Sequence, residues 1–247
     1  MRPKGTAAAV GRSLRTYYAD PARDAAMDAL YARLVRPGDL VFDIGAHVGD
    51  RIAAFRRLGA RVVALEPQPG PFRALQLLYG RDPDVQLVAA AAGDAAGEVT
   101  LHVNSANPTV STASPAFVAA ADGAEGWEDQ AWDAAVTVPC LTLAALISAH
   151  GRPAFVKIDV EGFEDRVLMG LSEPVPALSF EFTTIARDVA ARALDRLAAL
   201  GPYRFDVALG EGQQLVFGTF VSGTAMASYI EALPHGANSG DVYAVLA

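Results

Sequence analysis

Short apolar runs alternate along this chain with segments whose hydrophobic residues recur every three or four positions. The run LVFDIG at 40–45 precedes such a segment at 51–59, and the run RVVALEP at 61–67 precedes another at 71–80. Apolar runs of this length are typical of strands buried on both faces, and the helical period is typical of the helices that connect them. The pattern therefore predicts an α/β protein built on a largely parallel sheet.

The same alternation continues to the end of the sequence. Further strands are expected at 85–93, 98–103, 136–140, 154–160, 177–182, 203–209, 213–220 and 241–247, the last three with antiparallel edges. Further helices are expected at 143–151, 163–170 and 188–200.

Two segments lie outside this alternation. Asp20 and Pro21 predict the start of a helix, so residues 1–37 are expected to form a helical N-terminal extension. Residues 104–132 are rich in Ser, Thr, Asn and Pro, which predicts a loop insertion without a core of its own. We interpret residues 1–247 as one domain that carries both features.

Composition narrows the class of protein. The chain has 247 residues, a formal net charge of −8 and one cysteine, Cys140, so it cannot form an internal disulfide. Its N-terminal segment lacks the apolar stretch of a signal peptide, and its apolar runs are shorter than the ~20 residues of a membrane span. The arginines are scattered, so the acidic chain is not expected to bind nucleic acid. A cytoplasmic location, no membrane role and a small-molecule or peptide partner are expected.

The stretch between residues 40 and 69 carries the first candidate site. Asp43, Gly45 and Gly49 follow the first strand, and Glu66 ends the second. In open α/β sheets such turns bind ligands, and an acid after the second strand can accept hydrogen bonds from ribose hydroxyls. A dinucleotide fingerprint would need glycine where His47 stands, so a pyrophosphate is disfavoured. A ribose-bearing cofactor without pyrophosphate, such as S-adenosylmethionine, fits this spacing.

A second candidate site is the charged stretch FVKIDVEGFE at 155–164. Lys157, Asp159 and Glu161 recur at period 2 within an apolar strand, so their side chains share one side. Burying the lysine is costly unless it is paired, and we expect its partner to be Asp43 or Glu161.

Together, VFDIGAHVGD…VVALEP and VKIDVEGFE resemble the FkbM-type family of S-adenosylmethionine-dependent methyltransferases over about residues 38–182. The resemblance implies a class I methyltransferase (Rossmann-like) fold, with a seven-stranded mixed sheet in the order 3-2-1-4-5-7-6 and helices on both faces. It further implies O-methylation of a hydroxyl on a small molecule, sugar or natural product. Its cofactor-binding positions would be Asp43, Gly45, Ala46, His47, Gly49, Glu66 and Asp159. His47 departs from the small amide residue often found there.

The acceptor side is expected near the ends of the fourth and fifth core strands. Asp159 and Glu181 are the candidates to orient the acceptor hydroxyl and receive its proton, and Lys157 is given a structural and electrostatic role. These carboxylates could instead hold Mg²⁺, but no third ligand is evident, which favours a metal-free site. Asp94, after the third strand, is a candidate partner for the adenine amino group.

Covers for this site are the Tyr17–Tyr18 pair and the insertion 104–132. Trp127 and Trp132 either belong to this cover or are surface anchors of the loop. Two alternatives stay open, an NAD-dependent oxidoreductase and a non-catalytic cofactor-binding protein. The acceptor and the oligomeric state cannot be read from the sequence.

Overall fold

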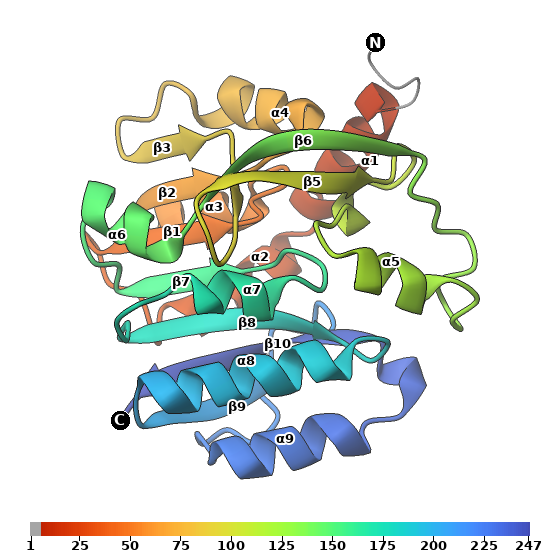
Figure 1. Cartoon of the computed structure of the whole chain (residues 1–247). Helices are drawn as coiled ribbons and strands as arrows, with labels where there is room; N and C mark the ends of the chain where they lie inside the picture. Colours follow the sequence, from red (N-terminus) through yellow and green to blue (C-terminus); the bar gives the residue numbers. More distant parts are fainter. Residues whose placement is uncertain (1–5) are drawn as a thin grey trace.

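A seven-stranded mixed sheet organises the protein, which we describe over residues 6–247 from a computed structural model (Figure 1). Its strands are β1 (Leu40–Ile44), β2 (Arg61–Leu65), β3 (Val85–Val88), β7 (Phe155–Ile158), β8 (Ala177–Thr183), β9 (Tyr203–Leu209) and β10 (Ser239–Leu246). They lie in the order β3-β2-β1-β7-β8-β10-β9, and only β10 runs antiparallel to its neighbours. The expected class and strand order are confirmed.

Helices cover both faces of this sheet. They are α1 (Thr6–Tyr18), α2 (Pro21–Tyr31), α3 (Asp50–Arg57), α4 (Pro69–Tyr79), α5 (Pro115–Ala121), α6 (Leu143–His150), α7 (Glu164–Met169), α8 (Arg187–Leu200) and α9 (Gly223–Ala232). In Figure 1, α7, α8 and α9 lie in front of the sheet, and α2 and α3 lie behind it. The parallel strands are thereby buried on both sides, as their apolar runs require.

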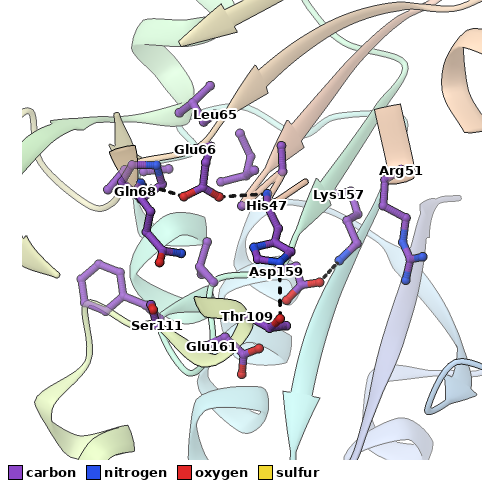
Figure 2. Close-up of a pocket in the computed structure, with 18 of the residues that line it drawn as sticks. His47, Arg51, Leu65, Glu66, Gln68, Thr109, Ser111, Lys157, Asp159 and Glu161 are labelled. Atoms are coloured by element: carbon purple, nitrogen blue, oxygen red, sulfur yellow. Dashed lines mark hydrogen bonds and ion pairs between the residues drawn. The ribbon is translucent and has the colours of Figure 1, made fainter. Parts of the chain in front are cut away.

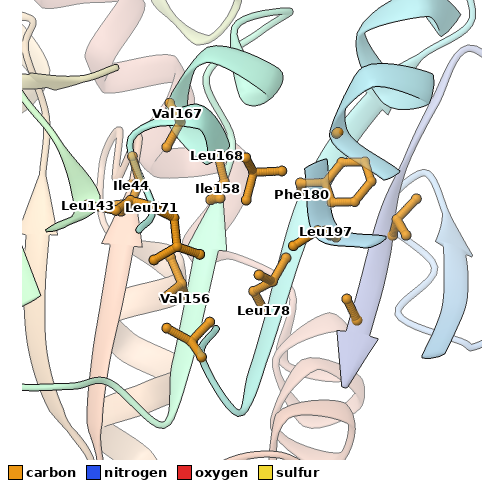
Figure 3. Close-up of a cluster of buried hydrophobic side chains, with 14 of the residues drawn as sticks. Ile44, Leu143, Val156, Ile158, Val167, Leu168, Leu171, Leu178, Phe180 and Leu197 are labelled. Carbon is orange, nitrogen blue, oxygen red and sulfur yellow. The ribbon is translucent and has the colours of Figure 1, made fainter. Parts of the chain in front are cut away.

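Two hydrophobic layers result. The front layer packs Val156, Ile158 and Phe180 of the sheet against α7 and α8 (Figure 3). The rear layer packs Phe155 and Tyr243 against α2 and α3. Because side chains alternate along each strand, residues two apart from Phe155 and Tyr243 face the same rear layer.

The N-terminal extension is helical where the structure describes it, while residues 1–5 lie outside that part. Asp20 caps α2, as expected, because its carboxylate accepts hydrogen bonds from the backbone N–H groups of Ala22 and Arg23 at 3.0 and 3.1 Å. No helix within residues 6–247 is both long and apolar enough to cross a bilayer.

A second, three-stranded sheet corrects one strand prediction. Residues 85–93 form not one strand but two, β3 in the main sheet and β4 (Ala91–Ala92) in the second one. There β4 pairs with β6 (Ala134–Leu141), which also pairs antiparallel with β5 (Gly97–Val103). The alanine run leaves the main sheet because β4 pairs with β6. The apolar character of the run does not determine which sheet it joins.

Two further segments differ from expectation. Residues 213–220 form no strand and meet β9 at one isolated bridge, between Ala208 and Leu215. The reason is local, since the Phe217 N–H donates to the Asp206 carboxylate instead of extending a ladder. Residues 104–132, expected to be a loop, contain a 3₁₀ helix (Pro108–Val110) and α5.

Helix α4 offers a matched test of the rear layer. Leu75 is fully buried, whereas Leu77 on the same helix is 80% exposed. Leu75→Ala should lower the free energy of unfolding by about 2–5 kcal/mol through lost burial and a cavity, and Leu77→Ala should change it by less than about 0.5 kcal/mol. Urea denaturation measures both values, and equal losses would contradict the described packing.

Candidate active site

A pocket opens where β1, β2 and β7 end at their carboxyl edges, as expected for an open α/β sheet (Figure 2). Its wall includes Gly45, Ala46, His47, Glu66, Gln68, Tyr17, Thr109, Ser111, Lys157, Asp159, Glu161 and Glu211. Of the predicted cofactor positions, Asp43, Gly49 and Asp94 do not line it.

The loop after β1 is shaped by close backbone contacts. The N–H groups of Gly45 and Ala46 both donate to the Leu65 carbonyl, at 3.0 and 2.9 Å. Gly45 has φ +85°, and a Cβ built there would lie 1.8 Å from the Asp159 carbonyl oxygen. Glycine is therefore required at this position by the approach of β7.

His47 occupies the left-handed region, with φ +46°. Asn and Gly adopt this conformation more easily than most residues, which agrees with the small amide residue that the family resemblance implies here. The His47 ring faces Tyr17 edge-on at 6.1 Å, and Nε2 lies 3.4 Å from the Thr109 hydroxyl. Burial lowers the pKa of His47 to about 4, so its ring is neutral at physiological pH.

Glu66 is held by the backbone at the end of β2. One carboxylate oxygen accepts the His47 N–H at 2.9 Å and the other accepts the Gln68 N–H at 2.7 Å. The residue is only 2% exposed, and burial raises its pKa to about 8 although the two backbone hydrogen bonds act in the opposite direction. The pocket therefore contains a fixed carboxyl group whose protonation changes near neutral pH.

A row of polar side chains crosses the rear face of the sheet beneath this pocket. Cross-strand register pairs Asp43 with Lys157, Lys157 with Ser179, Ser179 with Tyr243, and Tyr243 with Asp206. Asp43 is fully buried and neither of its carboxylate oxygens has a hydrogen-bond partner within residues 6–247. Burial raises its pKa to about 7, against the lowering effect of the nearby Lys157 ammonium.

Lys157 forms the central ion pair of the site. Its Nζ lies 2.5 Å from Asp159 Oδ2 and 3.7 Å from Asp241 Oδ1. The expectation that Asp43 or Glu161 would be its partner is therefore wrong. Asp159 is nearer because the chain leaves β7 at Ile158. Asp241 comes from β10, whose register against β8 the sequence does not give.

Two glutamates complete the acidic side. Glu161 follows β7 with φ +57°, and the Thr112 hydroxyl donates to its carbonyl at 2.6 Å. Asp159, Glu161 and Glu181 can each present a carboxylate oxygen within 4.8 Å of the other two. Burial and the Asp159 charge hold the pKa values of Glu161 and Glu181 well above their usual range. The pKa of Asp159 is lowered, since the Lys157 ammonium outweighs the effect of burial.

Comparison with known families shows which protein family the chain belongs to. The family model described as Methyltransferase FkbM domain matches residues 43–199, more than half of the chain. The protein belongs to the FkbM methyltransferase family. Membership confirms the expected methyltransferase class with S-adenosylmethionine as cofactor, and it decides against the NAD-dependent oxidoreductase.

No curated protein sequence matches the chain. Among solved structures, the O-methyltransferase from Bacillus cereus in complex with SAH is similar at 12% identity, covering 97% of this chain and 91% of that one with a TM-score of 0.49. A putative O-methyltransferase from Klebsiella pneumoniae is similar at 11% identity, 97% and 90% coverage and a TM-score of 0.48. Fibrillarin from Aeropyrum pernix with bound S-adenosyl-L-methionine gives 9% identity, 90% and 73% coverage and a TM-score of 0.46. These values describe a general likeness of chain folding.

In this FkbM methyltransferase, two of the predicted cofactor positions have other surroundings: Gly49 packs against α4, and Asp94 lies outside the pocket. Gly49 meets α4, because a Cβ there would lie 2.6 Å from the Tyr79 ring. Asp94 lies outside the pocket wall and pairs with Arg166 at 3.0 Å. Asp94 lies away from the pocket because the alanine run before it joins the second sheet. Ala90, Ala91 and Ala92 line the pocket instead.

Of the two segments predicted to cover the site, the Tyr17–Tyr18 pair and residues 104–132, only some residues line the pocket. Tyr17 lines it, whereas Tyr18 bonds to the Val48 carbonyl and the Tyr79 hydroxyl. From residues 104–132, Thr109 and Ser111 line the wall, but Phe117 and Trp127 pack edge-on with ring centroids 5.2 Å apart. Trp127 is 7% exposed, so it belongs to a small hydrophobic cluster and is no surface anchor.

Sequence reasoning did not single out Gln68, Arg51 or Glu211 as pocket residues. Glu211 reaches the wall from the segment after β9, where it pairs with Arg23 at 2.7 Å. Nothing in the local pattern around Glu211 indicates this contact, since its ion-pair partners Arg23 and Arg51 lie in α2 and α3.

Two glycines with the same φ of +85° test the loop geometry. A Cβ added at Gly38 would meet open space, whereas a Cβ added at Gly45 would meet the Asp159 carbonyl. Gly38→Ala should cost only the backbone strain of ~1–2 kcal/mol. Gly45→Ala should cost more in unfolding free energy and also weaken S-adenosylhomocysteine binding, measured by denaturation and calorimetry. Equal effects of the two substitutions would refute the close approach of β7 to the loop.

Proposed function

We propose that this methyltransferase transfers the methyl group of S-adenosylmethionine to a hydroxyl oxygen of a small-molecule acceptor. The observation that carries the proposal is Glu66, a buried carboxyl group at the end of β2 whose two oxygens are oriented by backbone N–H groups. Each oxygen keeps a lone pair for a further donor. Two vicinal ribose hydroxyls are donors of that kind.

The cofactor loop supports the same placement. Gly45, Ala46 and His47 form the wall next to Glu66, so the ribose would lie against them and the sulfonium would extend toward Asp159. Methyl transfer is an in-line displacement in which the acceptor oxygen bonds to carbon while sulfur retains the electron pair of the broken bond. The protein's main task is to align these three atoms.

The acidic side favours a hydroxyl acceptor. A hydroxyl must lose its proton during transfer. We assign its orientation and proton acceptance to Asp159, which lines the pocket, and to Glu181, whose carboxyl oxygen lies within 4.8 Å of an Asp159 oxygen. Lys157 acts as a positioning residue, because its ammonium holds the Asp159 carboxylate. An acidic wall and a net charge of −8 would repel a polyphosphate backbone, so we propose no nucleic-acid substrate.

Glu66 gives a test with two readouts. Glu66→Ala should weaken S-adenosylhomocysteine binding at least about tenfold, since hydrogen bonds to a charged group contribute ~1.5–3 kcal/mol. Because the free carboxyl has a pKa of about 8, it is mostly protonated at pH 7, and ribose binding to the carboxylate should release a proton. Affinity should therefore rise as pH increases toward 8.

Calorimetry in buffers of different ionisation enthalpy measures this proton release. The control is Glu66→Gln, which carries no ionisable proton and should show no release from this position. Unchanged affinity in Glu66→Ala, or equal proton release by wild type and Glu66→Gln, would remove Glu66 from the ribose site.

The acceptor class has its own experiment. Cell extract should be incubated with the protein and S-adenosylmethionine that carries a deuterated methyl group, and products with the labelled methyl identified by mass spectrometry. We expect label on oxygen of a small molecule, and much less of it with Glu66→Ala when S-adenosylmethionine is limiting. Label found only on nitrogen, or only on nucleic acid, would contradict the proposed reaction.

A further inference from the structure

Three carboxylates converge beside the pocket from two neighbouring strands. Asp159 and Glu161 follow β7, and Glu181 lies near the end of β8. Each can contribute an oxygen within 4.8 Å of the other two. This separation is compatible with three oxygens around one small cation, whose bonds to oxygen are about 2.0–2.6 Å.

The charges of this group are not balanced by the protein. Within residues 6–247 its ion pairs come from Lys157, which is 1% exposed and is shared between Asp159 and Asp241. The Glu161 side chain has no ion pair or hydrogen bond in that part of the chain, although the residue is only 7% exposed and lines the pocket. The buried Oε2 of Glu181 also has no hydrogen-bond partner there. Unpaired buried carboxylates are costly and require a cation or protons.

Local structure holds Glu161 in this position. Its carbonyl accepts the Thr112 hydroxyl, and the following turn is fixed by Glu164, whose Oε1 accepts the N–H groups of Val160 and Gly162 at 3.1 and 3.2 Å. Glu164 is therefore satisfied by the backbone, whereas Glu161 points an unpaired carboxylate at the group. The two adjacent glutamates have distinct tasks.

We propose that Asp159, Glu161 and Glu181 bind one divalent cation of the Mg²⁺ or Mn²⁺ type. An all-carboxylate set without histidine or cysteine suits hard cations, and water or acceptor hydroxyls would fill the other coordination positions. The third ligand that was not evident from the sequence is Glu161. The role of the ion rests on the proposed function: beside the methyl group, the cation would lower the pKa of a coordinated hydroxyl.

Binding can be measured without any reaction. Mn²⁺ is titrated into the full-length apo protein, and the free ion is followed by its electron paramagnetic resonance signal. We expect one Mn²⁺ per chain, displaced by Mg²⁺, and at least about tenfold weaker binding in Glu161→Gln and in Glu181→Gln. The matched control is Glu164→Gln, which keeps the Oε1 acceptor, lies outside the group and should change affinity by less than about threefold.

Thermal denaturation separates a lost site from a damaged fold. Glu161→Gln replaces a buried carboxyl group that has no partner in the described part of the chain, so its melting temperature without metal should equal or exceed that of wild type, while Mg²⁺ should stabilise only wild type and Glu164→Gln. Absence of Mn²⁺ binding at millimolar concentration, or equal binding by wild type and Glu161→Gln, would overturn the cation site.

These outcomes are independent of the proposed reaction. S-adenosylhomocysteine binding and EDTA-insensitive methyl transfer in a protein that does not bind Mn²⁺ would leave the proposed function intact and refute the cation site. Specific Mn²⁺ binding by a protein that methylates no hydroxyl would support the cation site and refute the proposed function.

Discussion

The ion pair between Lys157 and Asp159 is the interaction on which the site depends. An ammonium group in the middle of a parallel sheet, covered by helices on both sides, is stable only with a counter-charge at contact distance. Lys157 finds it 2.5 Å away at the first residue beyond its own strand. The pair fixes the Asp159 side chain at the rim, and the Asp159 carbonyl in turn excludes any side chain from position 45.

The two ends of the pocket use carboxylates in different ways. Glu66 is oriented by neutral backbone donors and keeps a raised pKa, which suits it to accept hydrogen bonds from uncharged hydroxyls. Asp159 is oriented by a cation and keeps a lowered pKa, so it stays ionised. Identical chemical groups thus differ in charge state because burial dominates at Glu66, whereas the Lys157 ammonium outweighs burial at Asp159. In the proposed site, Glu66 would serve cofactor recognition, whereas Asp159 supplies a permanent negative charge.

The positions of Gly45, Glu66 and Asp159 could be predicted from the sequence because they depend on local pattern and on the chain order of βα units. The strand order, in which the last strand lies between two earlier ones, came only from the family resemblance. The partner of Lys157 could not, since Asp241 reaches it from β10 across a register that only the folded sheet defines. Asp94 was misplaced for a related reason: an alanine run carries no information about which sheet it joins. Glu161 was recognised within its motif, but its closeness to Glu181 depends on the pairing of β7 and β8.

The position of β10 between β8 and β9 has a consequence for folding. This strand lies between β8 and β9, yet it is made after both of them, so the sheet cannot close until residues 239–246 have left the ribosome. Until then β8 has an unpaired edge, and Lys157 lacks the nearby charge of Asp241. Contacts between segments so distant in sequence form late because of the entropy of loop closure. During synthesis the nascent chain should therefore expose a hydrophobic strand edge that a chaperone can bind.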